Sequence, residues 1–84
     1  MYRVIVLRSA EKDLKRLSSE IRARVANALR SLAENPRPPG SRKLAGTDGD
    51  WRIRVGDYRI VYEIADEIRI VRINRVRHRS DVYR

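Results

Sequence analysis

The stretch that decides the fold is Trp51-Arg52-Ile53-Arg54-Val55-Gly56-Asp57-Tyr58-Arg59-Ile60-Val61-Tyr62. Apolar and other residues alternate on both sides of Gly56-Asp57, and a period of two is typical of β-strands with one buried face. A Gly-Asp dipeptide between two such strands predicts a two-residue hairpin turn. The resulting register pairs Val55 with Tyr58, Arg54 with Arg59, Ile53 with Ile60, and Trp51 with Tyr62.

This register divides the side chains of the hairpin between two faces of a sheet. We expect the aromatic and aliphatic residues to face a layer of helices, and Arg52, Arg54 and Arg59 to share the opposite face. Like charges directly across two strands are destabilising, so stability alone does not explain Arg54 opposite Arg59. The pattern predicts an anion-binding site. The alternatives are that the guanidinium groups extend into water, or that Glu63 and Asp57 neutralise them.

The residues before the hairpin predict one strand and two helices. Residues 1–7 are short and β-branched, as in a strand. Ser9 is the expected N-cap of a first helix, and a second helix begins near Glu20 with apolar residues at a period of 3.6. Asn35-Pro36 ends it, because the residue before proline avoids helical backbone angles.

The remaining segments complete the topology. Residues 35–50 contain all three prolines and three of the four glycines, which predicts a long loop. A turn at Asp66-Glu67 leads to a last strand over 68–76, which would place Arg59 near Asn74. The expected fold class is α+β in the order β-α-α-β-β-β: an antiparallel twisted sheet with a helical hairpin packed on one face, as a single domain over 1–84.

Composition narrows the classes of function. The chain has 84 residues, 20 Lys or Arg against 11 Asp or Glu, and a net charge of +9. Seventeen of the basic residues are Arg, which suits forked recognition of phosphate, although GC-rich codon usage also favours Arg. Without cysteine and with one histidine, a disulfide framework, a thiolate nucleophile and a structural zinc site are excluded. Short apolar runs predict no membrane span, and we expect a cytoplasmic protein.

The carboxyl end adds further candidates for a binding site. Arg77, His78 and Arg79 follow the expected last strand, and Tyr83 is the next-to-last residue of the sequence. The face that Arg77 takes stays open, because one β-bulge would reverse it. A lone histidine is more often a surface residue than a catalyst.

These stretches resemble the RelE/ParE superfamily of toxins from bacterial and archaeal toxin–antitoxin pairs. The resemblance covers nearly the whole chain, through the opening strand with Tyr2 and the loop residues Lys43-Leu44-Ala45-Gly46. Its most specific parts are residues 51–62 and His78-Arg79-Ser80-Asp81-Val82-Tyr83. It implies the RelE-like fold, which is also that of microbial ribonucleases, and a small cognate antitoxin as partner. It does not decide the activity, because this scaffold includes mRNA nucleases and gyrase poisons.

For the nuclease branch, the resemblance implies cleavage of mRNA on the ribosome. The ribose 2′-hydroxyl would attack the adjacent phosphorus and leave a 2′,3′-cyclic phosphate, with no metal and no small-molecule cofactor. By position, Arg54, Arg59 and Arg77 match basic catalytic residues and Tyr83 matches the terminal tyrosine. The implied RNA-binding set is Arg42, Lys43, Arg52, His78 and Arg79.

One departure from the family concerns the general base. Some members have Lys where this chain has Arg52 and Arg54, and Arg stays protonated. The base would then be Tyr83, His78, a ribosomal group or water. Two other functions stay open: a ParE-like poison of DNA gyrase, and a catalytically inert basic module that binds RNA or protein.

Overall fold

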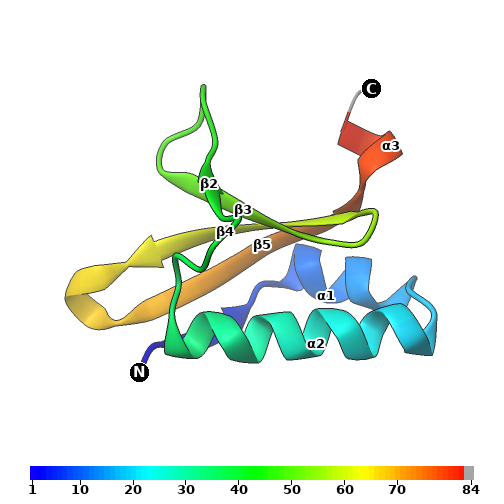
Figure 1. The fold of residues 1–84 in the computed structure, drawn as a ribbon, viewed down its shortest axis with the longest axis horizontal. Helices are drawn as coiled ribbons and strands as arrows, with labels where there is room; N and C mark the ends of the chain where they lie inside the picture. Colours follow the sequence, from blue (N-terminus) through cyan, green and yellow to red (C-terminus); the bar gives the residue numbers. More distant parts are fainter. Residues whose placement is uncertain (83–84) are drawn as a thin grey trace.

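A five-stranded sheet with two helices on one face forms the protein, as expected for the α+β class (Figure 1). The computed structural model describes residues 1–82. The strand order is β1-β5-β4-β3-β2. The elements are β1 (Arg3–Val6), α1 (Arg8–Lys15), α2 (Ser19–Glu34), β2 (Arg42–Lys43), β3 (Asp50–Val55), β4 (Tyr58–Ala65), the 3-10 helix η1 (Asp66–Ile68), β5 (Ile70–His78) and α3 (Arg79–Val82).

Two strand assignments differ from the sequence expectation. β1 runs parallel to β5, so the sheet is mixed rather than wholly antiparallel. The hydrophobic pattern of a strand is the same in either direction, and the sequence therefore carried no signal for it. In addition, Arg42–Lys43, within the segment expected to be a loop, forms the short edge strand β2 against β3.

Local side-chain bonds explain where the helices begin. Ser18 is the N-cap of α2, and its Oγ accepts a hydrogen bond from the Ile21 N–H at 3.3 Å. The expected cap of α1 at Ser9 is wrong, because Leu7 holds that position without a side-chain bond. Ser9 instead donates its hydroxyl to the carbonyl of Asn74 at 2.7 Å. Its side chain is used for a tertiary contact.

Side chains of α1 cover the edge of β5 where β1 ends. Pairing with β1 stops at Ile73, which would leave the next outward-facing polar groups of β5 without partners. Ser9 bonds the Asn74 carbonyl, and Asp13 Oδ2 accepts from the Val76 N–H at 2.9 Å. Asp13 also holds the Arg75 guanidinium at 2.9 and 3.2 Å. Helix α1 therefore lies along β5 in place of a further strand.

The core lies between the sheet and the two helices. The predicted alternation is confirmed: Ile53, Ile60 and Tyr62 are buried, and Trp51, Val55 and Tyr58 pack against them. Tyr62 is fully buried and donates its hydroxyl to the Pro36 carbonyl at 2.7 Å. This bond satisfies the phenol and fixes the chain as it leaves α2.

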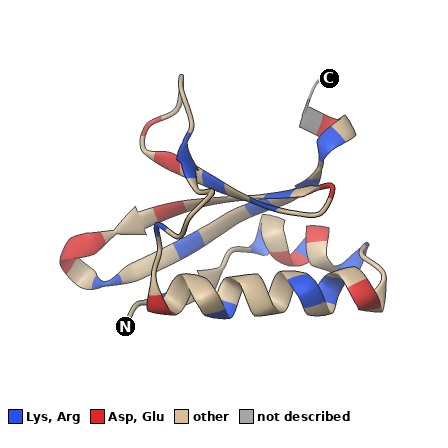
Figure 2. Cartoon of the chain, in the orientation of Figure 1, with Lys and Arg blue, Asp and Glu red and all other residues tan. Residues whose placement is uncertain are grey.

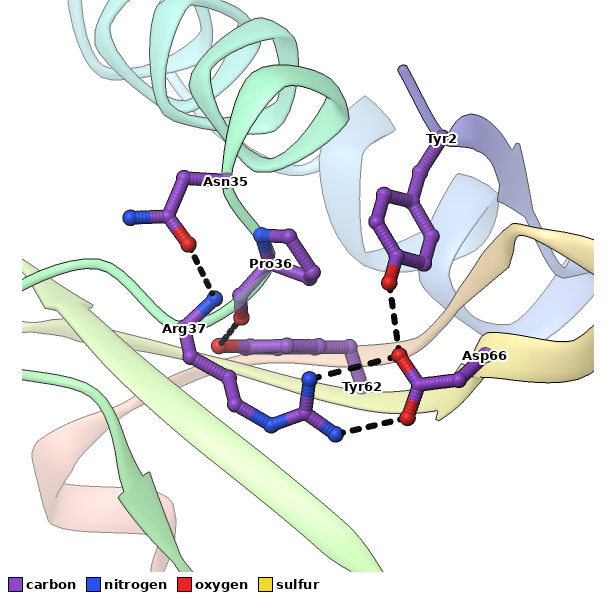
Figure 3. A network of polar contacts seen from close by, with 6 residues as sticks. All are labelled: Tyr2, Asn35, Pro36, Arg37, Tyr62 and Asp66. Carbon is purple, nitrogen blue, oxygen red and sulfur yellow. Dashed lines mark hydrogen bonds and ion pairs between the residues drawn. The ribbon is translucent and has the colours of Figure 1, made fainter.

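A polar network anchors the loop after α2 to the β4–β5 turn (Figure 3). Arg37 grips both carboxylate oxygens of Asp66 at 2.9 and 3.3 Å, and Tyr2 donates its hydroxyl to Oδ1 at 2.6 Å. The hydrogen bonds from Arg37, and then from Tyr2, lower the pKa of Asp66 to about 2. Arg37 also lies 5.2 Å from the ring centre of Trp51. The network thus steadies the segment that leads to β2.

Candidate functional site

The β3–β4 hairpin has the predicted register. Arg54 pairs with Arg59, and all four pairs expected from the two-residue turn are present. Gly56 has φ +59°, as in a turn whose first central residue is in the left-handed region. A Cβ there would also lie 3.4 Å from the Arg24 guanidinium, which reaches across from α2. The backbone angle therefore favours glycine, whereas the contact with Arg24 would be an ordinary van der Waals one.

Four arginines gather on the sheet face that is turned away from α1 and α2. Arg42 pairs with Arg52 across β2 and β3, and Arg52 shares its face with Arg54 and Arg59. We call these four residues the arginine cluster. Figure 2 shows basic segments of β2 and β3 where the two strands meet. No ion pair within residues 1–82 engages any of the four, so the cluster's charge is left uncompensated there.

The charges of these side chains act on one another. The pKa of Arg52 is lowered, first by burial and then by the positive charges of Arg54, Arg59 and Arg42. The guanidinium of Arg52 still stays protonated, so its burial and the repulsion from three neighbouring cations both act on a charged group. Neutralisation by Glu63 or Asp57 does not occur among the described ion pairs. Asp57 instead lies 3.8 Å from Arg79.

A cavity of about 290 Å³ opens beside the hairpin turn. The start of α3 closes one side of it, because the Arg79 N–H donates to the Asp57 carbonyl at 2.8 Å. Arg54 and Arg59 from the cluster and Arg79 from α3 thus bring three guanidinium groups to one space. The lining consists of Arg54, Gly56, Asp57, Tyr58, Arg59, Arg79 and Ser80.

Arg77 stands opposite Arg59, three residues beyond the expected partner Asn74. Two features produce the shift. The turn after β4 contains η1 and Arg69 in the left-handed region, and the β4–β5 ladder has a bulge between Val61 and Tyr62. Both are set by tertiary packing and were invisible in the alternation pattern.

The side chain of Arg77 nevertheless lines a different cavity. This second cavity, of about 250 Å³, also contains Asp13 and Asp81. Burial favours a higher pKa for Asp13, but the hydrogen bonds from Arg75 and Val76 outweigh it and lower the pKa. The positive charge of Arg77 adds to this lowering. Arg77 therefore joins the register of the site without lining the cavity that holds Arg54 and Arg59.

His78 is turned away from the arginine cluster. It pairs with Tyr58, and their rings meet edge to face with centres 5.2 Å apart. Its Nδ1 accepts from the Ser80 N–H at 3.2 Å and lies 2.8 Å from the Ser80 Oγ. This places the proton of a neutral imidazole on Nε2. The ring acts as an N-cap for α3, because it accepts from the N–H of the second helical residue.

Some of the other predicted binding residues lie at the candidate site, and some lie away from it. Arg42 and Arg52 belong to the arginine cluster, and Arg79 lines the first cavity. Lys43 pairs with Trp51, so the register gives it the opposite face from Arg42. Tyr83 lies outside the described residues. Asp57 and Ser80 line the first cavity but were not among the predicted site residues, because a turn and a short helix carry no periodic signal.

The arrangement is suited to holding a phosphodiester. Guanidinium groups donate paired hydrogen bonds to phosphate oxygens. Groups fixed in advance around the place where negative charge develops lower the barrier of phosphoryl transfer.

None of the helices within residues 1–82 has the length and hydrophobicity that a membrane-spanning helix needs.

The sequence and the fold are both similar to those of known proteins. A family model described as the ParE toxin of the type II toxin–antitoxin system parDE matches residues 4–83. Toxin RelG of Mycobacterium tuberculosis is 40% identical over 99% of this chain and 97% of that protein.

Two solved complexes have the same fold. The toxin–antitoxin complex RelBE2 from M. tuberculosis has a chain with a TM-score of 0.83 and 33% identity, covering 92% of this chain and 96% of that one. The archaeal RelE–RelB complex from Pyrococcus horikoshii gives 0.82 and 28%, with coverages of 93% and 94%.

Proposed function

This chain belongs to the RelE/ParE family of toxins from type II toxin–antitoxin systems, and on that premise we propose that it is a ribosome-dependent endoribonuclease that cleaves mRNA. The observation that carries the proposal is the convergence of Arg54, Arg59 and Arg79 on one cavity. Neither Arg54 nor Arg59 has an ion-pair partner within residues 1–82. A stable fold gains nothing from such a cluster, whereas a phosphate site needs it.

The reaction balances without an added reagent. The 2′-oxygen of one ribose forms a bond to the adjacent phosphorus as its proton leaves, and the bond from phosphorus to the 5′-oxygen breaks. The 5′-oxygen takes up a proton, and the products are a 2′,3′-cyclic phosphate and a 5′-hydroxyl. Arg54 and Arg59 hold the non-bridging oxygens and keep the reacting atoms in line. Arg79, from the same lining, stabilises the additional negative charge and the leaving oxygen. Arg77, which pairs with Arg59 in the sheet, adds positive charge beside the site.

The proton acceptor is not an arginine. The one carboxylate among the described residues of the cavity lining belongs to Asp57, which lies 3.8 Å from Arg79. His78 has its Nδ1 engaged by Ser80 and lines the second cavity. Tyr83, a ribosomal group or water is left as the acceptor. The chain then contributes mainly position and charge, and the ribosome completes the site.

We assign the partners on the same basis. The solved relatives are complexes of RelE-type toxins with RelB antitoxins, and we expect a cognate antitoxin here. Its acidic residues would cover the arginine cluster and neutralise it. Ribosome and mRNA would meet the same face, which places the protein in the cytoplasm.

Primer extension on cellular mRNA after brief induction tests the proposed activity. New stops within codons are expected with the parent chain, and none with Arg54→Ala or Arg59→Ala, while both variants still fold and bind the antitoxin. Retained growth arrest in both variants would contradict the assigned site.

The family model is described as ParE, which makes a gyrase poison the second candidate. A DNA-damage response without cuts in mRNA would identify that activity. A gyrase poison would not require Arg54 and Arg59 to share a cavity, so the two variants also separate the candidates.

A further inference from the structure

Three basic residues form a row along α1, outside the site described above. Arg8, Lys12 and Arg16 are four residues apart, which places them on one face of the helix at steps of about 6 Å. All three are exposed, and no ion pair within residues 1–82 engages any of them. We call them the α1 row.

The α1 row lines a cavity. A cavity of about 330 Å³ is lined by Arg8, Ser9, Lys12, Asp13, Arg16 and Arg75. Asp13 is occupied by Arg75 and by the Val76 N–H, so its charge is compensated within the lining. The three cations of the row therefore set the sign of the cavity.

This cavity adjoins the proposed cleavage site through a second cavity that shares lining residues with both. It shares Asp13, Arg16 and Arg75 with the second cavity, and the second cavity shares Tyr58 with the first. The connection is possible because α1, not a further strand, lies along the end of β5 (Figure 1). A series of adjoining cavities thus leads from the arginine cluster around the edge of β5 to the α1 row, with Arg75 and Arg77 between them.

We propose that the α1 row is a second RNA-binding surface that holds the phosphodiester backbone of a single strand extending from the cleavage cavity. The inference rests on the proposed function and adds where the strand runs. All six residues of the lining are polar or charged. A docking protein segment needs a buried apolar anchor, whereas a sugar–phosphate backbone needs cations at intervals. The lining therefore favours RNA over an acidic protein segment.

Binding of short 2′-O-methyl RNA, which lacks the attacking hydroxyl, tests the proposal without cleavage. The row variant is Arg8→Gln, Lys12→Gln, Arg16→Gln. The control variant is Arg3→Gln, Lys15→Gln, Arg30→Gln, which removes the same charge at exposed positions that line none of the three cavities. An oligonucleotide of four nucleotides reports binding at the first cavity alone, and one of twelve nucleotides reports binding that extends to the α1 row.

The expected result is specific to the longer strand. Losing three phosphate contacts makes the log–log salt slope for the twelve-mer shallower by about 2. Between 50 and 200 mM salt, the affinity of the parent then falls about 16-fold more than that of the row variant. The control variant keeps the parental slope, and the four-mer binds all three proteins with similar slopes.

Three outcomes would overturn the inference. They are equal slopes for the row and control variants on the twelve-mer, absence of twelve-mer binding by the parent at 50 mM salt, and weaker antitoxin binding by the row variant with RNA binding unchanged. The last would assign the row to an acidic protein segment. If the parent binds the twelve-mer through the row but leaves mRNA uncut, the RNA-binding surface is supported and the proposed nuclease activity is refuted.

Discussion

Replacing Arg59 with glutamine should stabilise the protein while removing the proposed ribonuclease activity. Arg59 stands opposite Arg54 on one side and opposite Arg77 on the other, so the substitution relieves two directly opposed like-charged pairs. Each such pair is worth about 0.2–1 kcal/mol. We therefore expect a gain of about 1 kcal/mol in the free energy of unfolding. For a domain of this size, that raises Tm by roughly 4–8 °C.

Thermal unfolding at low and high salt measures this gain. The control is Arg3→Gln, which removes the same charge from an exposed strand position whose partner in β5 is Ile70. The gain from Arg59→Gln should shrink as salt rises, because screening already weakens the repulsion in the parent. Equal Tm values for the two variants, or a loss of stability in Arg59→Gln at low salt, would refute the reasoning.

Three further predictions concern the bonds that support the site. The pKa of Asp66 is lowered to about 2 in the folded protein. The ionised carboxylate therefore stabilises the fold fully above about pH 4, and this stabilisation is lost as pH falls toward 2. Asp66→Asn should make Tm depend less on pH in that window. Asp13→Ala leaves the Val76 N–H unpaired and should cost about 2 kcal/mol in urea unfolding, against about 1 for Asp13→Asn, which keeps an acceptor. His78→Ala should speed amide exchange at Ser80 and cost about 1 kcal/mol locally, whereas His78→Asn keeps the cap.

The hairpin could be predicted from the sequence because its determinants are local. Gly56-Asp57 fixes the loop length, and the loop length fixes which residues face each other. The opposition of Arg54 and Arg59 follows directly. The helices were equally accessible through the 3.6 period and through the Asn35-Pro36 stop.

The rest of the site depended on contacts that are distant in sequence. The partner of Arg59 in β5 was three residues off because the β4–β5 turn and the bulge are decided by packing. His78, predicted to bind RNA, lines the second cavity and not the first, because its ring packs against Tyr58 and caps the start of α3. The hydroxyl of Ser9 bonds a strand carbonyl that only the folded chain brings near.

The most direct measurement of the central claim is single-turnover cleavage of a defined mRNA on purified ribosomes. Parent, Arg59→Gln and Arg3→Gln are compared, with the new 3′ end identified by mass spectrometry. We predict a 2′,3′-cyclic phosphate from the parent, a rate about 10²–10³-fold lower for Arg59→Gln, and a rate within about twofold of the parent for Arg3→Gln. Cleavage by Arg59→Gln at the parental rate, or an intact message with the parent, would contradict the claim that the arginine cluster holds the scissile phosphate.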